Sequence, residues 1–295
     1  MKNIPFGFAL WFRENDNEER LFKMNILTVD VEEYFSLLGE NCDVHYESRL
    51  EHEVGLLLDI LDDMNIKATF FYPGEIVDKH TDILQEIARR FDIGLHGYRH
   101  VEATKMSTEE FRQDVLRAKD TVEALTGKSV SKLRAPGFAL NKDYVKVLFD
   151  CGIETDCSCV NINHQFGKKI IERAKPCLLE YNGGTIKEFP PTSISFLGKG
   201  FGFLGGGYFR LLPYGLIRYF SERNKDYLLT YVHPRDFDAA QPVVGNISPA
   251  RKFKSYVGLQ GAEKKLRHWL TEYTFTDITT AEKLIDWQSV PVVEL

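Results

Sequence analysis

The chain has 295 residues and a formal net charge of −6, from 37 basic and 43 acidic side chains. Hydrophobic residues make up 43% and charged residues 27%, which is typical of a soluble globular protein and excludes a disordered chain. An acidic chain offers no general basic face, so nucleic acid is excluded as the main partner. The sequence has no apolar run of about 18 residues, so we expect no transmembrane helix.

The five cysteines show no repeated spacing, which makes a poor disulfide framework. We therefore expect reduced thiols in a cytoplasmic protein, with membrane association as a further expectation. Residues 1–23 are predicted to be a mobile N-terminal extension, or else Met24 is the true start of the protein. Residues 24–295 contain no repeat or Pro/Ser-rich linker and are expected to form a single barrel domain that ends in a helical segment.

Short apolar runs, rich in β-branched and aromatic residues, predict strands buried on both faces, as in a parallel sheet. These runs lie at residues 24–29, 68–72, 93–95, 133 and 227–232, with a weaker one at 186–189. Helical periodicity lies between them, at residues 53–64, 107–125, 141–149 and 262–273. This alternation predicts an α/β domain built from crossover connections.

A chemically capable side chain stands at the carboxyl end of several predicted strands. These side chains are Asp30, His96, Arg134 and His233. In a β/α barrel, the carboxyl ends of the strands converge on one mouth, where active sites are built. We therefore predict that these side chains surround one pocket.

Two of the motifs carry groups that bind metals. His96 and His100 are four residues apart, so on a helical turn both imidazoles would face one metal ion. Asp30 and Glu32 point to the same side if the chain is extended there, because side chains alternate along a strand. Two histidines and one carboxylate leave open positions on a divalent metal, which is typical of catalytic sites. The other carboxylate could act as a general base on water.

Two further residues have both a catalytic and a structural interpretation. Arg134 could pair with the carboxylate base and keep it ionised, or it could form a structural salt bridge. His233 could protonate a departing amine near neutral pH, or it could be a satisfied core histidine. The residues alone leave both alternatives open.

Several segments, taken together, resemble the polysaccharide deacetylases of the NodB-homology group, the carbohydrate esterase family four type. The segments are T-V-D-V-E-E-Y-F (28–35), H-G-Y-R-H (96–100), R-A-P-G-F (134–138) and Y-V-H-P-R-D-F-D (231–238). Two more, G-G-G-Y-F-R-L-L-P (205–213) and Y-V-G-L (256–259), are similar to the subgroup found with bacterial exopolysaccharide and O-antigen loci. The resemblance implies a distorted (β/α) barrel of about seven parallel strands and a divalent metal, most often zinc.

The resemblance also implies a role for each matching residue. Asp30 would be the base, His96 and His100 metal ligands, Arg134 the partner of the base, and His233 the acid. The family motif has a second aspartate where this chain has Val31, so Glu32 is expected to take the metal. Asp156 is expected to hold Arg134, and the backbone N–H of Tyr98 or a neighbour to stabilise an oxyanion.

We therefore predict a hydrolase that removes N-acetyl groups from amino sugars of a bacterial surface polysaccharide or its precursor, including a lipid-linked amino sugar. The alternatives are a deformylase or a metal-independent cyclic-amide hydrolase on the same fold, or an inactive sugar-binding protein.

Two other motifs point to partners. The basic clusters R-K-F-K (251–254) and K-K-L-R (264–267) indicate a solvated helix face or contact with anionic lipid. Residues 200–205 fit G-x-G-x-x-G by letter, but no βαβ unit surrounds them, so we expect a glycine loop and no dinucleotide site.

Overall fold

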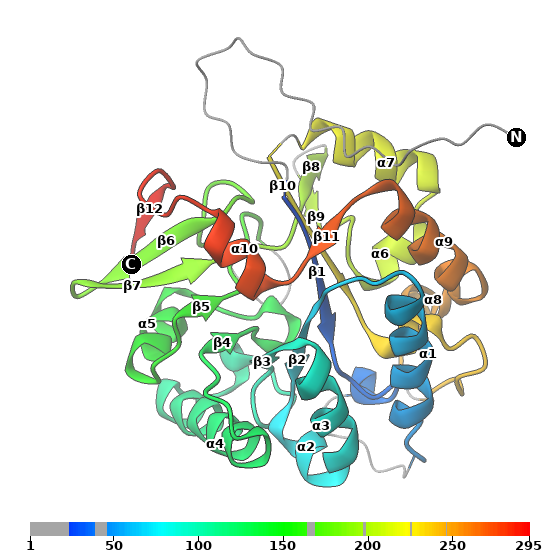
Figure 1. Cartoon of the computed structure of the whole chain (residues 1–295), viewed down its shortest axis with the longest axis horizontal. Coiled ribbons are helices and arrows are strands. Elements are labelled where there is room, and N and C mark those ends of the chain that lie inside the picture. Colours follow the sequence, from blue (N-terminus) through cyan, green and yellow to red (C-terminus); the bar gives the residue numbers. More distant parts are fainter. Residues whose placement is uncertain (1–23, 39–45, 164–168, 197–198, 225, 246) are drawn as a thin grey trace, which may run out of the picture.

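The computed structural model describes residues 24–38, 46–163, 169–196, 199–224, 226–245 and 247–295. The predicted extension at residues 1–23 lies outside this part of the chain. Within it, one ten-stranded sheet has the order β10-β1-β2-β3-β4-β5-β7-β6-β12, and β11 pairs with β1 (Figure 1). Its strands are β1 (Met24–Asp30), β2 (Thr69–Tyr72), β3 (Asp92–Leu95), β4 (Lys132–Leu133), β5 (Thr155–Asp156), β6 (Cys177–Tyr181), β7 (Gly184–Glu188), β10 (Tyr227–Val232), β11 (Phe275–Thr276) and β12 (Val292–Glu294).

The central part of the sheet is a distorted barrel. From β10 through β1 to β7 each neighbouring pair is parallel, and the β6–β7 hairpin is antiparallel. The chain after β7 returns to β10: the Tyr227 hydroxyl donates to the Pro190 carbonyl at 2.8 Å, and the Leu229 N–H donates to the Thr192 hydroxyl at 2.7 Å. The predicted α/β class and distorted barrel of about seven parallel strands are confirmed.

Helices cover the outside of these strands (Figure 1). They are α1 (Leu50–Asp63), α2 (Gly74–Lys79), α3 (Thr81–Arg90), α4 (Thr108–Thr126), α5 (Lys142–Asp150), α6 (Gly206–Leu211), α7 (Tyr214–Arg223), α8 (Pro249–Tyr256), α9 (Leu259–Glu272) and α10 (Ile278–Leu284). The predicted helices are α1, α4, α5 and α9, and a capping box of Ser107 and Glu110 starts α4. The short helices α2, α6 and α10 were not predicted, because six or seven residues are too few to show a clear helical period.

The strands that carry the site run through the core. Every residue of β1 and of β2 is buried, as expected for strands covered on both faces. Trp269 of α9 is fully buried against β10, where its indole N–H donates to the Thr230 hydroxyl at 3.1 Å. The core therefore fixes the strand ends that reach the mouth.

The glycine motif at residues 200–205 has no dinucleotide context. Its first glycine lies in β9 (Lys199–Phe201), which pairs antiparallel with β8 (Ile194–Phe196) in a separate two-stranded sheet. A Cβ on Gly200 would lie 2.0 Å from the Ile162 side chain, and one on Gly205 would lie 1.8 Å from the Tyr231 ring. These glycines allow close packing inside the protein.

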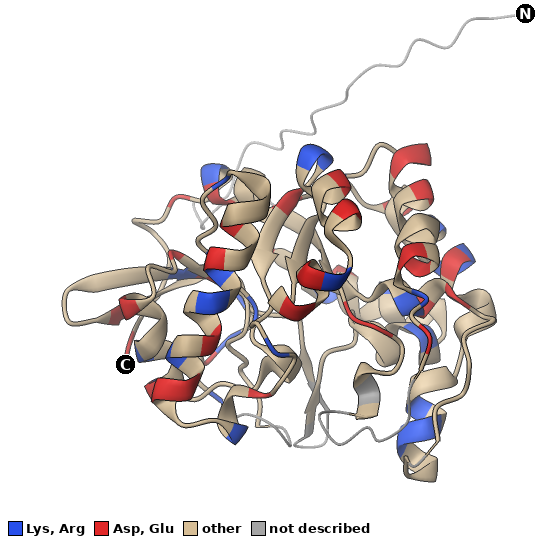
Figure 2. Cartoon of the chain, turned by 90° about the horizontal axis from the view of Figure 1, so that it is seen from below, with Lys and Arg blue, Asp and Glu red and all other residues tan. Residues whose placement is uncertain are grey.

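In the view of Figure 2, both basic and acidic residues occur along the helices. Among the described helices, none is long and apolar enough to cross a membrane.

Helix α1 contains an unusual buried carboxyl group. Glu53 is fully buried, and neither of its carboxylate oxygens has a hydrogen-bond partner in the described part of the chain. Burial, followed by the negative charges of Asp238 and Glu33, raises the pKa of Glu53 to about 8, against the opposing charges of Arg235 and Arg49.

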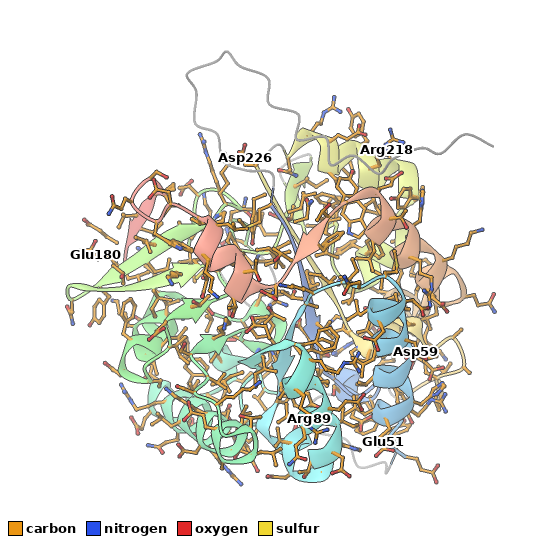
Figure 3. All side chains as sticks on the ribbon, in the orientation of Figure 1. Glu51, Asp59, Arg89, Glu180, Arg218 and Asp226 are labelled. Atoms are coloured by element: carbon orange, nitrogen blue, oxygen red, sulfur yellow. The ribbon has the colours of Figure 1, made fainter. Side chains whose placement is uncertain are left out.

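This burial predicts a pH-dependent stability. The pKa of Glu53 in the folded protein lies above its value of about 4.3 in the unfolded chain. Protonation of this carboxyl group therefore contributes its full stability below about pH 4.3, and this contribution is lost as the pH rises through about 8. We expect the natural chain to lose free energy of unfolding relative to Glu53→Gln between these two pH values, by at most about 1.4 kcal/mol per pH unit. Urea unfolding across this range measures the difference, and Asp59→Asn, on α1 in Figure 3, is the surface control. A difference that does not change with pH would contradict this prediction.

Candidate active site

The predicted polar residues lie at one end of the barrel. Asp30 ends β1, His96 follows β3, Arg134 follows β4, Asp156 ends β5 and His233 follows β10. All these strands are parallel, so their carboxyl ends open on the same mouth.

Glu32 is the centre of the cluster. Its Oε1 lies 2.9 Å from His100 Nε2, 3.3 Å from His96 Nε2 and 3.8 Å from His233 Nε2. Donor atoms of Glu32, His96 and His100 all lie within 4.8 Å of one another, and so do those of Asp30, Glu32 and His233. The structure thus brings together the side chains that the sequence placed around one pocket.

A backbone contact orients one predicted imidazole ligand, and the turn after β3 brings the second one beside it. His96 is buried, and its Nδ1 lies 2.7 Å from the Arg134 carbonyl oxygen, so Nδ1–H donates there and Nε2 faces Glu32. The chain from Tyr98 to His100 is a bend, so the expected helical turn is wrong. Gly97 has φ +72°, and this turn still brings the two rings to a centroid distance of 5.2 Å.

The expected oxyanion donor is engaged elsewhere. The backbone N–H of Tyr98 donates to Asp114 Oδ2 at 2.7 Å, and that of Arg99 donates to Asp114 Oδ1 at 3.1 Å. Asp114 is buried on α4 and ties the bend to that helix. The N–H groups of Tyr98 and Arg99 therefore already have a carboxylate partner, which contradicts the prediction that the Tyr98 N–H stabilises an oxyanion.

Glu32 reaches the mouth because the strand pattern continues past Asp30. The Val31 N–H donates to the Phe71 carbonyl at 3.0 Å, and the Val31 side chain is fully buried in the core. Glu33 turns away: it accepts a hydrogen bond from Ser48 and lies 3.6 Å from His80 Nε2. The alternation thus selects Glu32 as the neighbour of the imidazoles.

The electrostatics of the cluster favour a charged carboxylate. Burial alone would raise the pKa of Glu32, but the charges of His100 and His233 outweigh it and hold the pKa well below its usual value. Burial alone would lower the pKa of His233, but the charges of Glu32 and Asp236 outweigh it and raise the pKa to about 9. The negative charge of Glu32 likewise raises the pKa of His100 against burial.

This donor set fits a divalent metal. Donor atoms bound at about 2.0–2.1 Å in a tetrahedral site are about 3.3 Å apart, close to the 2.9 and 3.3 Å measured from Glu32 to the imidazoles. Glu32, His96 and His100 would hold the ion through one carboxylate oxygen and two Nε2 atoms, and Asp30 and His233 would stand beside it.

Arg134 holds Asp30 as the sequence predicts. Its Nη1 donates to Asp30 Oδ1 at 2.7 Å and to the Thr28 hydroxyl at 2.8 Å, and the guanidinium is fully buried. Its carbon lies 4.4 Å from the centre of the Phe71 ring. Burial opposes the charge of Arg134, but the attraction to Asp30 outweighs it and raises the pKa of Arg134.

Asp156 does not take its expected place beside Arg134. The Ser158 hydroxyl donates to Asp156 Oδ1 at 2.6 Å, and the Cys159 thiol lies 3.5 Å from Oδ2. The Ser158 hydroxyl in turn accepts the N–H of Ala135 at 2.7 Å. Asp156 therefore supports the backbone next to Arg134, and the prediction that it holds the guanidinium is wrong. Burial raises the pKa of Asp156, as expected for a carboxyl group without a cation beside it.

Sequence reasoning missed the partner of His233. Asp236 Oδ2 lies 3.1 Å from His233 Nδ1, and Arg210 Nε lies 2.9 Å from Asp236 Oδ1. The available signal was the aspartate three residues after the histidine in H-P-R-D, which reaches back as a helix cap does.

A barrel mouth that gathers imidazoles and carboxylates, one of them held by a buried arginine, is typical of hydrolases that use a divalent metal. Comparisons with known proteins agree. Residues 48–155 match the family model described as "Polysaccharide deacetylase", and residues 157–283 match "Domain of unknown function (DUF3473)". The chain is thus similar to polysaccharide deacetylases over residues 48–155 and to the domain of unknown function over residues 157–283.

Curated relatives share part of the chain. A peptidoglycan-N-acetylglucosamine deacetylase of Bacillus cereus is 33% identical over 81 residues, which are 27% of this chain and 30% of the relative. A peptidoglycan deacetylase-like protein of Gibberella zeae is 35% identical over 168 residues, 53% of this chain and 47% of the relative. The chain thus spans less than half the length of either relative.

A solved structure supports the fold. A putative polysaccharide deacetylase from Mycobacterium smegmatis superposes with a TM-score of 0.64 at 16% identity, over 92% of this chain and 94% of that one. At this identity the likeness concerns the fold.

The cluster predicts where a metal binds. We expect the purified chain to hold about one zinc or cobalt ion, and Glu32→Gln and His100→Ala to hold it at least tenfold more weakly, because each loses a ligand. Elemental analysis after dialysis against a weak chelator measures this. Glu33→Gln is the matched control, since this neighbouring carboxylate faces Ser48 and His80. Equal metal content in Glu32→Gln and the natural chain would exclude Glu32 as a ligand.

Proposed function

We propose that this protein removes N-acetyl groups from amino sugars by metal-dependent amide hydrolysis. The observation that carries the proposal is the gathering of Asp30, Glu32 and His233 within 4.8 Å, beside the His96–His100 pair. This places a base, an acid and a set of metal donors in one cluster. The names of the curated relatives, which include peptidoglycan-N-acetylglucosamine deacetylases, support an N-acetylated sugar as the substrate.

The proposed metal is zinc, held by Glu32, His96 and His100; when bound, it supplies a Lewis acid for the acetyl carbonyl group. Asp30 takes a proton from the water that attacks the carbonyl carbon. Arg134 fixes one oxygen of Asp30, and the other oxygen bonds to none of the described side chains.

His233 completes the proposed reaction. As the C–N bond breaks, the nitrogen must receive a proton, because an amide nitrogen does not leave as an anion. His233 donates that proton from Nε2, the nitrogen that faces Glu32 at 3.8 Å, and the products are acetate and a free amine. The negative charge of Asp236 beside Nδ1 raises the pKa of His233 and so favours its protonated, proton-donating form.

Acetate release tests the reaction. We expect the natural chain loaded with zinc to release acetate from N-acetylglucosamine oligomers or peptidoglycan fragments. Asp30→Asn and His233→Ala should each lower kcat by about 10²–10⁴-fold while keeping the metal, because each loses a proton-transfer group. His52→Ala, which changes an exposed histidine on α1, is the control.

Other outcomes of the same assay correspond to the alternative functions. Formate release from N-formyl analogues, with no acetate, would indicate a deformylase. Hydrolysis of a cyclic amide by metal-free protein would indicate the metal-independent reaction. Sugar binding without turnover under any divalent metal would indicate an inactive binding protein. Each of these would overturn the proposed reaction.

We further propose that the substrate is part of a bacterial surface polysaccharide or its lipid-linked precursor. We also propose that helix α8 contacts an anionic membrane. Arg251 and Lys252 form no ion pair with any described residue, and Phe253 between these basic residues and Lys254 is 60% exposed. An exposed aromatic ring flanked by cations is typical of interfacial helices. The second basic cluster is engaged inside the protein: Lys265 donates to three carbonyl groups around the end of α6, and Arg267 pairs with Glu263 and Asp63.

Vesicle flotation tests this contact. We expect the full chain to float with vesicles of phosphatidylcholine and phosphatidylglycerol, and to bind less when Lys252→Glu or Phe253→Ser is introduced. Each basic residue near an anionic surface contributes about 1 kcal/mol, so the charge reversal Lys252→Glu, a change of two charges, should weaken binding by roughly thirtyfold. Lys264→Glu on α9 is the charge-matched control. Equal flotation with pure phosphatidylcholine would contradict the proposal.

A further inference from the structure

We propose that Asp236 and Arg210 position the imidazole of His233, so that the second half of the chain orients the proton donor of the reaction. This inference rests on the proposed function for its kinetic meaning. Its geometry stands on contacts that none of the comparisons assigns. Both residues lie in the segment matched by the domain of unknown function.

Asp236 holds His233 at two points. Its Oδ2 accepts the backbone N–H of His233 at 2.9 Å and lies 3.1 Å from the ring Nδ1. The short helix η4 (Pro234–Phe237) produces this arrangement by turning the chain back on itself after β10. With Nδ1–H donated to Asp236, the other nitrogen, Nε2, is the one that faces the pocket. The ring therefore has a defined tautomer and direction.

Arg210 holds Asp236 from the far side. Its Nε lies 2.9 Å from Asp236 Oδ1, and both side chains are almost wholly buried. The other guanidinium nitrogens donate to the backbone carbonyls of Val257 at 2.8 Å and Lys254 at 3.4 Å. Burial alone would raise the pKa of Asp236, but the charges of Arg210 and His233 outweigh it and hold the pKa well below its usual range. The carboxylate is thus a fixed, charged acceptor.

The glycines that start α6 bring Arg210 to this place. Gly206 has φ +37°, and a Cβ on it would lie 3.0 Å from His233 Cε1. A Cβ on Gly207 would lie 2.9 Å from the Lys254 carbonyl oxygen. The His233 ring therefore packs between the glycine turn and Asp236. This accounts for the G-G-G-Y-F-R segment (205–210), which contains both the turn and the arginine.

A purely structural salt bridge would have different consequences from a positioning pair. A structural pair would stabilise the packing of α6 on η4 and leave turnover per folded molecule unchanged. A positioning pair changes kcat without changing the affinity for substrate, because proton donation is needed only as the C–N bond breaks. Asp238 provides the comparison. It lies two residues further on, is equally buried, and pairs with Arg49 at 2.6 Å without contacting His233.

Kinetics on the full chain test the inference. We expect Asp236→Ala to lower kcat for acetate release by about 10²-fold, with KM changed by less than about threefold. Asp236→Glu should recover part of that loss, and Arg210→Gln should lose about tenfold, with partial recovery in Arg210→Lys. Asp238→Ala should lower Tm while keeping kcat close to that of the natural chain. If Asp236→Ala does not fold, Asp236→Asn tests the same point, because it keeps the size and removes the negative charge that holds Nδ1–H.

A second readout does not depend on activity. In the full chain labelled with ¹⁵N-histidine, we expect a downfield Nδ1–H proton for His233, identified by its loss in His233→Ala. It should be lost or shifted upfield in Asp236→Ala and Asp236→Asn and remain in Asp238→Ala. If the natural chain releases no acetate but this proton behaves as expected, the proposed function fails and the positioning contact stands. A kcat within threefold of the natural value in Asp236→Asn, or an unchanged Nδ1–H proton, would overturn the inference.

Discussion

The buried guanidinium of Arg134 joins the strand ends from which the candidate site is built. Its side chain contacts Asp30 and Thr28 of β1 and the Cys157 carbonyl just after β5, and its own carbonyl oxygen accepts from His96 after β3. A buried charge is tolerated only when it is paired and hydrogen-bonded, and removing one partner typically costs about 3–5 kcal/mol. The same contacts that satisfy the arginine therefore set the distances between the base, the first imidazole and the turn after β5. The distances between these groups at the mouth of the barrel therefore depend on the Arg134 side chain, which also stabilises the barrel.

The site is assembled from three separate stretches of sequence. Asp30 and Glu32 precede both matched segments, His96, His100 and Arg134 lie in the first, and His233 lies in the second. The two matched segments contact each other beside the site. The Arg134 guanidinium donates to the Cys157 carbonyl, and the Ser158 hydroxyl accepts from the Ala135 N–H. Neither matched segment therefore contains the whole pocket. The domain of unknown function provides the strand that ends in His233 and, by the inference above, the residues that orient it.

The parts of the fold and site that the sequence predicted follow from short-range rules. Buried strands followed at once by a polar residue were recognisable for β1, β3, β4 and β10, and parallel pairing then brought those residues together. What could not be predicted depends on contacts between distant segments. Asp114 is 16 residues from Tyr98, and Arg210 is 26 residues from Asp236; no local pattern reveals either pairing. Strand β5 has only two residues, too few for any period, so the direction of Asp156 was open.

The departure at Val31 follows from the alternation of side chains along β1. Consecutive residues of a strand point to opposite faces, so a base and a ligand carboxylate on one face must be two residues apart. Asp30 and Glu32 satisfy this, and Val31 between them is fully buried in the core. An aspartate at position 31 in this backbone would place a charge among apolar side chains, at a cost of several kcal/mol unless it were paired. Glutamate, which is one methylene longer than aspartate, extends from the chain just after β1 to within 3.3 Å of both imidazoles. The valine and the longer acid thus suit this backbone together: Val31 fills the core, and Glu32 reaches the imidazoles.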